Sequence, residues 1–221
     1  MGSTAADPVL AAVLQKRVEA ITLEMATALL RTTRSTMFNQ VGDFITAVFD
    51  GRARTLAQTE FAAVIAFGAQ PSLEAIIDYF GDDLREGDVI AHNDVFSRGN
   101  QNHDLGFYIP VFWKGDIVGW VACKGHQADL GGATAGGYNP GITEVWQEAL
   151  RIPPLKIYDA GVLRRDVWNL IGANVRLDIV MEDIKSMIGA CTVGKRRVLA
   201  LIERYGLSRF TSHLDYVIER S

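Results

Sequence analysis

The sequence has 221 residues, of which 48% are hydrophobic and 22% are charged, a composition typical of a folded globular protein and not of a disordered chain. The formal net charge is -4, so the composition gives no support for a nucleic-acid or anionic-membrane partner. The length suits one large domain or two small ones. Because no repeat or linker is visible, we expect residues 1–221 to form a single domain.

The N-terminal part predicts one long amphipathic helix. Asp7 and Pro8 mark its start, because the carboxylate can cap the first turn and proline suits that turn. Apolar residues then recur at three- and four-residue steps from Leu10 to Leu29. We therefore expect the helix to continue to about Arg34.

A central β-rich part follows this helix. Residues 44–49 and 54–58 flank an Asp-Gly turn and predict a hairpin. Residues 73–80 predict a short helix, and residues 88–92 predict another strand.

The next segments complete an α+β fold. Residues 107–113 and 117–124 are apolar on both faces, which predicts two buried strands joined by the tight turn Lys114-Gly115-Asp116. After Pro154 we expect only helices. They fall near residues 161–174, 181–191, 194–205 and 208–219, with a C-cap at Gly206.

The sequence also gives expectations about the cellular compartment. Cys123 and Cys191 are far apart and lack metal or redox spacing, which favours buried free thiols in a reducing compartment, with a disulfide left open. The N-terminus shows no basic region followed by an apolar run, so no signal peptide is visible. No apolar stretch reaches the roughly 18 residues that a membrane-spanning helix needs. We expect a cytoplasmic protein without a membrane partner.

The second hairpin predicts that two distant polar residues meet. With residues 114–116 as its loop, Trp113 lies opposite Ile117, and the same register places Asp104 opposite His126 at the open end. Opposed residues in antiparallel strands have Cβ atoms about 4.5–5.5 Å apart. A bulge or a one-residue change in the turn would break this alignment.

Further polar residues fall near this pair in the sequence. They are His92, Asp94, Gln101, His103 and Asp129. Aspartate and histidine together suit a divalent ion such as Mn²⁺, Fe²⁺ or Zn²⁺, with positions left for water or substrate. Simpler interpretations stay open: His126 as an ordinary hydrogen-bonded histidine, and Asp94 and Asp129 as turn residues.

The glycine-rich loop at 131–137 and two basic clusters later in the chain give only weak support for anion sites. Gly131, Gly132, Gly136 and Gly137 allow the backbone to approach an anion closely, but their spacing matches neither a Walker loop nor a dinucleotide fingerprint. We therefore expect no ATP binding by this chain. The basic run 195–197 and the pair at 164–165 lie on predicted helices among apolar residues, which favours solvated faces.

Several blocks of the chain are distinctive. They are FITAVFD with RTLAQ (44–58), GDVIAHND (87–94), PVFWKGDIVGWVACKGHQADLGG (110–132), TEVWQEALRIPPLK (143–156), RRDVWNLIGANVR (164–176) and GKRRVLALIERYG (194–206). In this order they resemble the B-type subunit of the hydantoinase/oxoprolinase family, which includes the large subunits of acetone and acetophenone carboxylases. The resemblance covers most of this chain but only the N-terminal part of such a subunit.

The resemblance implies a subunit of an ATP-dependent enzyme. A separate A-type subunit would bind ATP and activate a carbonyl or bicarbonate by phosphorylation. The B-type subunit would then open a cyclic amide or carboxylate a ketone. By the same resemblance Asp104 and His126 are metal ligands. In the enzyme hypothesis Asp94, Asp129 and His103 lie around them as catalytic residues.

The chain departs from the family pattern at several positions. Gln101 stands where the family has its first metal-binding histidine, and His103 is displaced from it by two positions. Gln127 replaces the second histidine of a common His-His-Ala-Asp motif. Residues 62–68 lack a usual histidine, Val95 follows Asn93-Asp94 in place of proline, and 135–138 read AGGY. The CKGH block and the hairpin before it resemble ketone carboxylases slightly more than oxoprolinases.

These observations leave competing hypotheses. The first is an enzyme subunit that works with an A-type ATP-binding subunit and a small-molecule substrate. The second is a non-catalytic assembly module that docks the A-type subunit, favoured by Gln101 and by the short length. A stand-alone metal hydrolase is a third interpretation.

Overall fold

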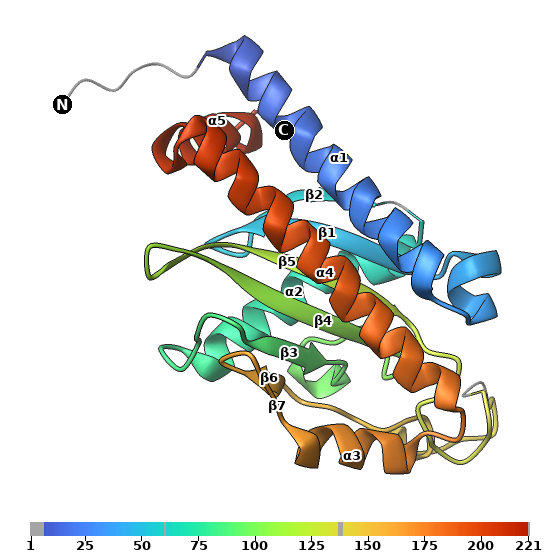
Figure 1. The fold of residues 1–221 in the computed structure, drawn as a ribbon. Helices are drawn as coiled ribbons and strands as arrows, with labels where there is room; N and C mark the ends of the chain where they lie inside the picture. Colours follow the sequence, from blue (N-terminus) through green and yellow to red (C-terminus); the bar gives the residue numbers. More distant parts are fainter. Residues whose placement is uncertain (1–6, 60, 137–138, 221) are drawn as a thin grey trace.

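The computed structural model describes residues 7–59, 61–136 and 139–220. Its centre is one seven-stranded antiparallel sheet in the order β2-β1-β5-β4-β3-β6-β7, with helices on both faces (Figure 1). The predicted α+β class is confirmed. The strands are β1 (Phe44–Asp50), β2 (Thr55–Gln58), β3 (Val89–His92), β4 (Asp104–Trp113), β5 (Asp116–His126), β6 (Leu155–Asp159) and β7 (Val162–Leu163).

The helices differ in length and type. The long ones are α1 (Pro8–Thr32), α2 (Ala63–Phe80) and α4 (Asp178–Tyr205). The shorter ones are α3 (Arg165–Asn174) and α5 (Leu207–Ile218), with a π-helical turn at Met37–Val41 and 3₁₀ turns at Val95–Ser97 and Val145–Gln147. The predicted cap is confirmed, because the Asp7 carboxylate accepts a hydrogen bond of 2.9 Å from the Val9 N–H.

Helices α1 and α4 lie side by side across one face of the sheet (Figure 1). The apolar stripe of α1 that includes Leu14, Val18 and Met25 is fully buried there, and each such side chain contributes about 1.5–3 kcal/mol of hydrophobic stabilisation. Cys123 of β5 and Cys191 of α4 are buried in the same layer as free thiols, as predicted.

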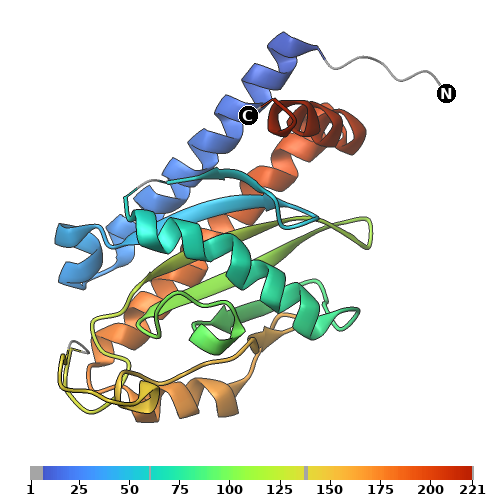
Figure 2. The same cartoon turned by 180° about the vertical axis from the view of Figure 1, so that it is seen from behind.

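Helix α2 covers the opposite face (Figure 2). The prediction of a short helix at 73–80 was wrong in extent, because α2 begins at Ala63 and continues through Pro71. Proline removes one helical hydrogen bond. Burial of Ile65 and Leu73 against the sheet outweighs that loss.

Two further predictions fail where tertiary contacts override local pattern. The chain after Pro154 is not entirely helical, since β6 and β7 extend the sheet beyond β3. Lys156 of β6 fixes this edge by its ion pair of 3.0 Å with the buried Asp88. The helices expected at 181–191 and 194–205 are one continuous helix, α4. Gly194 lies inside α4 and does not end a helix. The position requires glycine, because a Cβ there would come within 2.4 Å of the Met25 sulfur.

The β4–β5 hairpin reaches the predicted register by a different route. Its loop has two residues, Lys114 and Gly115, both with positive φ (55° and 96°), which is the geometry of a type I′ turn. A bulge then adds Val118, since Val111 pairs with Gly119 while Phe112 pairs with Ile117. The shorter turn and the extra residue compensate each other.

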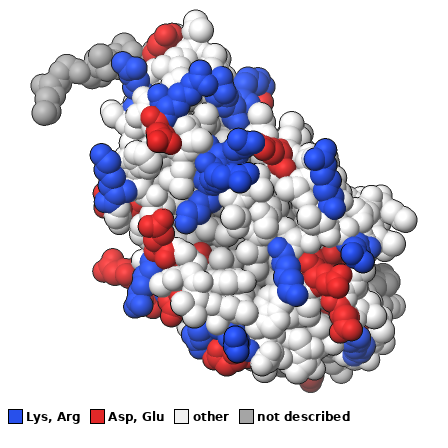
Figure 3. Space-filling model, in the orientation of Figure 1, with Lys and Arg blue, Asp and Glu red and all other residues white. Residues whose placement is uncertain are grey.

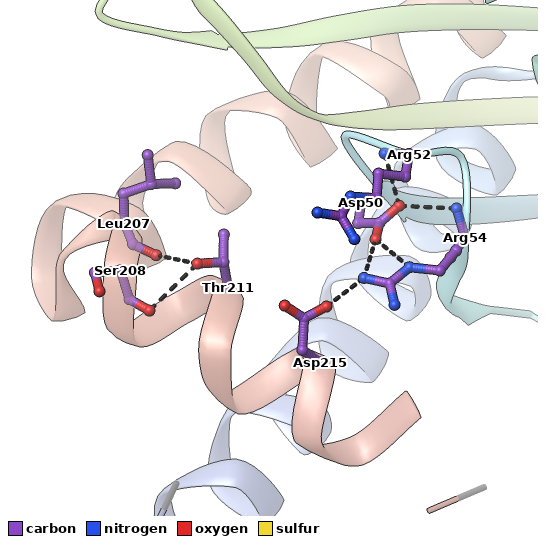
Figure 4. A network of polar contacts seen from close by, with 7 residues as sticks. All are labelled: Asp50, Arg52, Arg54, Leu207, Ser208, Thr211 and Asp215. Atoms are coloured by element: carbon purple, nitrogen blue, oxygen red, sulfur yellow. Dashed lines mark hydrogen bonds and ion pairs between the residues drawn. The ribbon is translucent and has the colours of Figure 1, made fainter. Parts of the chain in front are cut away.

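A small ionic network joins the first hairpin to the last helix (Figure 4). The Asp50 carboxylate accepts from the backbone N–H groups of Arg52 and Arg54, at 2.9 and 2.8 Å, and from Arg54 Nε at 2.6 Å. The Arg54 guanidinium also pairs with Asp215 of α5. The β1–β2 turn is thereby tied to α5, 161 residues further along the chain.

Basic side chains gather over α1 and α4 on the face that Figure 3 shows. Arg197 of the predicted basic run forms an ion pair with Glu24 of α1, and the two side chains are 49% and 41% exposed. This agrees with a solvated helix face. Within the described ranges, no helix is both long and apolar enough to cross a membrane.

Candidate functional site

The predicted meeting of Asp104 and His126 is confirmed. The two residues are direct cross-strand partners at the open end of the β4–β5 hairpin. Asp104 Oδ1 and His126 Nδ1 lie 3.0 Å apart, a hydrogen-bonding distance. Their side chains point to the sheet face that carries α2, because residues alternate in direction along a strand.

Asp104 is held from its other side as well. Asn100, in the loop before β4, donates a hydrogen bond from Nδ2 to Asp104 Oδ2. The aspartate is 2% exposed, so both of its oxygens are committed to protein partners in a nearly dry environment. An oriented carboxylate of this kind fixes the tautomer and the direction of the imidazole that it binds.

His126 combines this partner with access to solvent. Its side chain is 20% exposed, and no described residue forms a hydrogen bond with its Nε2. Burial lowers the pKa of His126, but the hydrogen bond and charge of Asp104, with smaller effects of Asp43 and Glu148, outweigh it and raise the pKa above the usual value. The imidazole is therefore a partly exposed base whose Nε2 has no described hydrogen-bond partner.

His103 packs flat against His126. The two ring centroids are 5.2 Å apart and the ring planes differ by 19°. His103 is 1% exposed, and its Nε2 has no hydrogen-bond partner among the described atoms. Burial and the neighbouring His126 lower the pKa of His103, so this ring is neutral at pH 7.

Asp94 and Asp129 each accept backbone hydrogen bonds within a turn or loop. Asp94 caps the 3₁₀ turn at Val95–Ser97 by accepting from Phe96 N–H, and its Oδ1 is 3.5 Å from Arg151 Nε. The fully buried Asp129 accepts from the N–H groups of Gly131 and Gly136 and pairs with Arg176 at 3.1 Å. The catalytic roles of Asp94 and Asp129 stay predictions. Gly137, one of the glycines considered for an anion site, lies outside the described residues.

Two charged residues near the pair were missed by sequence reasoning. The Asp43 carbonyl accepts the His126 N–H at 3.0 Å, and burial raises the pKa of the Asp43 carboxyl although His126 opposes the shift. Lys124 is fully buried and donates to Ser72 Oγ at 3.0 Å; burial lowers its pKa to about 8. Lys124 had a sequence signal, because it stands two residues before His126 and shares its face of β5.

The donor set does not fit the expected metal site. Among the residues described, no group of three or more His, Cys, Asp or Glu side chains is arranged to hold a metal ion. Asp104 is bound by His126 and Asn100, and the ring of His103 stacks on His126 instead of converging with it. Gln101 stands at the position where the resemblance places a histidine, so the metal-binding role of Asp104 and His126 stays a prediction.

Comparison with known proteins gives the family. Residues 7–221 match the model of the Hydantoinase B/oxoprolinase family. The chain belongs to this family. It is 39% identical over 204 residues to caprolactamase subunit beta of Pseudomonas jessenii, a match that covers 92% of this chain and 35% of that subunit.

Solved structures agree with the sequence match. The ATP-dependent caprolactamase from Pseudomonas jessenii superposes with a TM-score of 0.90 at 37% identity, over 96% of this chain and 37% of that one. The nucleotide-free acetone carboxylase superposes with a TM-score of 0.84 at 21% identity, over 94% and 28%, which shows a shared fold. The hydantoinase B/oxoprolinase chain thus spans little more than a third of the caprolactamase chain and 28% of the acetone carboxylase chain.

Proposed function

We propose that this chain carries an acid–base site of a subunit in an ATP-dependent enzyme that hydrolyses a cyclic amide, with ATP bound by an A-type partner subunit. The observation that carries the proposal is the Asp104–His126 pair, in which the carboxylate binds Nδ1 and no described residue binds Nε2. Residues 1–221 would act as one domain. The small-molecule substrate would reach the open end of the hairpin.

The geometry supports a separate role for each of Asn100, Asp104 and His126 in the proposed reaction. Asn100 orients Asp104, and Asp104 holds the proton on His126 Nδ1. The lone pair on Nε2 then accepts a proton from a water molecule that attacks the activated carbonyl, and the resulting imidazolium returns it to the leaving nitrogen. The buried carboxylate stabilises that imidazolium. No step passes through a metal ion, because the donor set does not fit one.

The comparisons favour an amide over a ketone substrate. Caprolactamase subunit beta, from an enzyme named for a cyclic amide, shares 39% of aligned residues with this chain. The acetone carboxylase structure shares only 21% and therefore supports the fold alone. Carboxylation of a ketone is the second candidate, and the CKGH block of the sequence is its support.

The test is turnover by the chain assembled with its A-type partner, assayed with cyclic amides and with ketones plus bicarbonate. ATP-dependent opening of an amide that is lost in His126→Ala, with assembly intact, supports the proposal. ATP-dependent ketone carboxylation would replace it by the second candidate.

A non-catalytic assembly module is the remaining alternative, and Gln101 together with the incomplete metal donor set favours it. In that case His126→Ala and Asp104→Ala would leave the turnover of the assembled enzyme unchanged.

A further inference from the structure

A cavity of about 590 Å³ lies beside the loop that Asp129 shapes. The residues that line it include Gly131, Gly132, the exposed Trp146, Arg151 and Arg176. No acidic side chain is among its described lining residues. The volume falls within the roughly 300–1,000 Å³ range of small-ligand sites.

Arg151 is the unusual residue of this cavity. Its guanidinium lies 5.0 Å from the centre of the Phe96 ring and 6.0 Å from that of Trp146. Asp94 approaches its Nε at 3.5 Å, but no described residue forms a hydrogen bond with its two terminal nitrogens. Aromatic rings against the guanidinium and a carboxylate at Nε leave the fork of terminal nitrogens free, and this fork is the group that binds carboxylate or phosphate with two parallel hydrogen bonds.

Arg176 and Gly132 also line this cavity. Arg176 pairs with Asp129 and donates to the Gly132 carbonyl, so its charge and hydrogen bonds are used within the protein. Gly132 has a φ of 84°, and a Cβ there would lie 2.4 Å from the Glu148 carbonyl oxygen. No described acceptor takes the Gly132 N–H, which leaves a backbone donor on this wall. The terminal nitrogens of Arg151 and this amide are thus two donors of the cavity wall without a described acceptor.

We propose that this cavity binds the oxyanion of a small molecule, a carboxylate or a phosphate, through the free fork of Arg151. Opening a cyclic amide creates a new carboxylate, so the product of the proposed reaction carries a matching group; this choice of ligand rests on the proposed function. The site is separate from the Asp104–His126 pair, because neither residue is among the described residues that line the cavity. Asn93 Nδ2 donates to the carbonyls of Leu150 and Asn102, next to Arg151 and His103 respectively.

The experiment is calorimetric titration of the full chain with inorganic phosphate and with ε-aminocaproate, an ω-amino carboxylate. We expect saturable binding that Arg151→Met weakens by about tenfold or more, because it removes the charged fork and keeps the side-chain stem. Arg151→Lys keeps the charge without the fork and should recover only part of the affinity. Arg31→Met, at an exposed arginine in the last turn of α1, is the matched control and should bind as the unaltered chain does.

The outcomes separate the ligand sources and the two proposals. Binding of ε-aminocaproate alone assigns the cavity to a carboxylate, and binding of phosphate alone assigns it to a phosphorylated compound. His126→Ala should bind anions normally, so failure of the acid–base site leaves this test intact. Equal affinity in the Arg151→Met variant, or no saturable binding, overturns the proposal. Loss of partner assembly in that variant with unchanged anion binding would make the cavity a docking surface and would also overturn it.

Discussion

Gly68 of α2 lies directly against the side chain of Asn100. A Cβ added to this glycine would be 2.7 Å from Asn100 Oδ1 and 2.8 Å from Asn100 Cγ. Because Asn100 holds Asp104, and Asp104 holds His126, the close approach of α2 to one loop side chain sets the position of the candidate base. The helix on this face of the sheet is part of the site although it contributes no group to the chemistry.

This relationship predicts the effect of Gly68→Ala. The added methyl group must displace Asn100, and overpacking of this kind typically costs about 1–3 kcal/mol of folding stability. Turnover should fall further than the stability loss explains, since the Asn100–Asp104 hydrogen bond is disturbed. Thermal unfolding and kinetics of the same preparation measure both.

The matched control is Gly189→Ala in α4, where an added Cβ meets nothing within 4 Å. There alanine should raise the free energy of unfolding by up to about 1 kcal/mol through its better helix propensity, with turnover unchanged. Equal effects of the two substitutions would show that Gly68 has no link to the site.

Replacement of His126 by alanine should lower kcat by about 10²- to 10⁴-fold, the usual contribution of a general base. Asp104→Asn should lower kcat as well, because the amide can donate to Nδ1 and favour the wrong tautomer. Steady-state kinetics of the assembled enzyme, with size-exclusion chromatography to check assembly, measure both effects. Asp116→Asn, at the exposed far end of the same hairpin, is the control and should retain full activity.

The pH dependence of kcat/KM should report His126. The imidazole acts as a base only when neutral, so activity should rise with pH, with a midpoint above 6.5 because Asp104 raises the pKa of His126. Asp104→Asn removes that cause and should shift the midpoint to lower pH. The same raised pKa stabilises the folded chain fully below about pH 6.5, and this contribution is lost as the pH rises through the folded-state pKa. A midpoint that does not move in Asp104→Asn would contradict the role of the pair.

Metal analysis of the purified chain, alone and with its partner, tests the metal prediction. The arrangement of Asp104, His126 and His103 leads us to expect no stoichiometric transition metal on the chain alone. A full equivalent of metal that disappears in His126→Ala would instead show that the resemblance, and not the hydrogen-bonded pair, describes the working state.

The hairpin shows how far the sequence alone can lead. The register carried outward from a three-residue loop at 114–116 predicted the Asp104–His126 pair, and the pairing is confirmed although the turn has two residues and not three. The prediction survived because the bulge at Val118 restores the register that the shorter turn would have shifted. A bulge depends on local twist and on neighbouring strands, so the apolar pattern of this hairpin gave no sign of it.

Other parts of the site depend on contacts that no local pattern contains. Asn100 reaches Asp104 from an irregular loop, and Asp43 meets His126 only because β1 pairs with β5. Strand β6 forms because β3 offers it a free edge, and Lys156 finds its partner Asp88 there. Such features follow from the assembled fold.

The two margins of the sheet limit how this protein can associate. One margin is β2, with four residues, and the other is β7, with two, so neither offers a long row of free backbone groups. A partner that joined by adding a strand would gain few hydrogen bonds at either margin. If a companion chain binds this protein, we expect it to contact helix and loop side chains, so mutations that separate the two should be sought first on those surfaces.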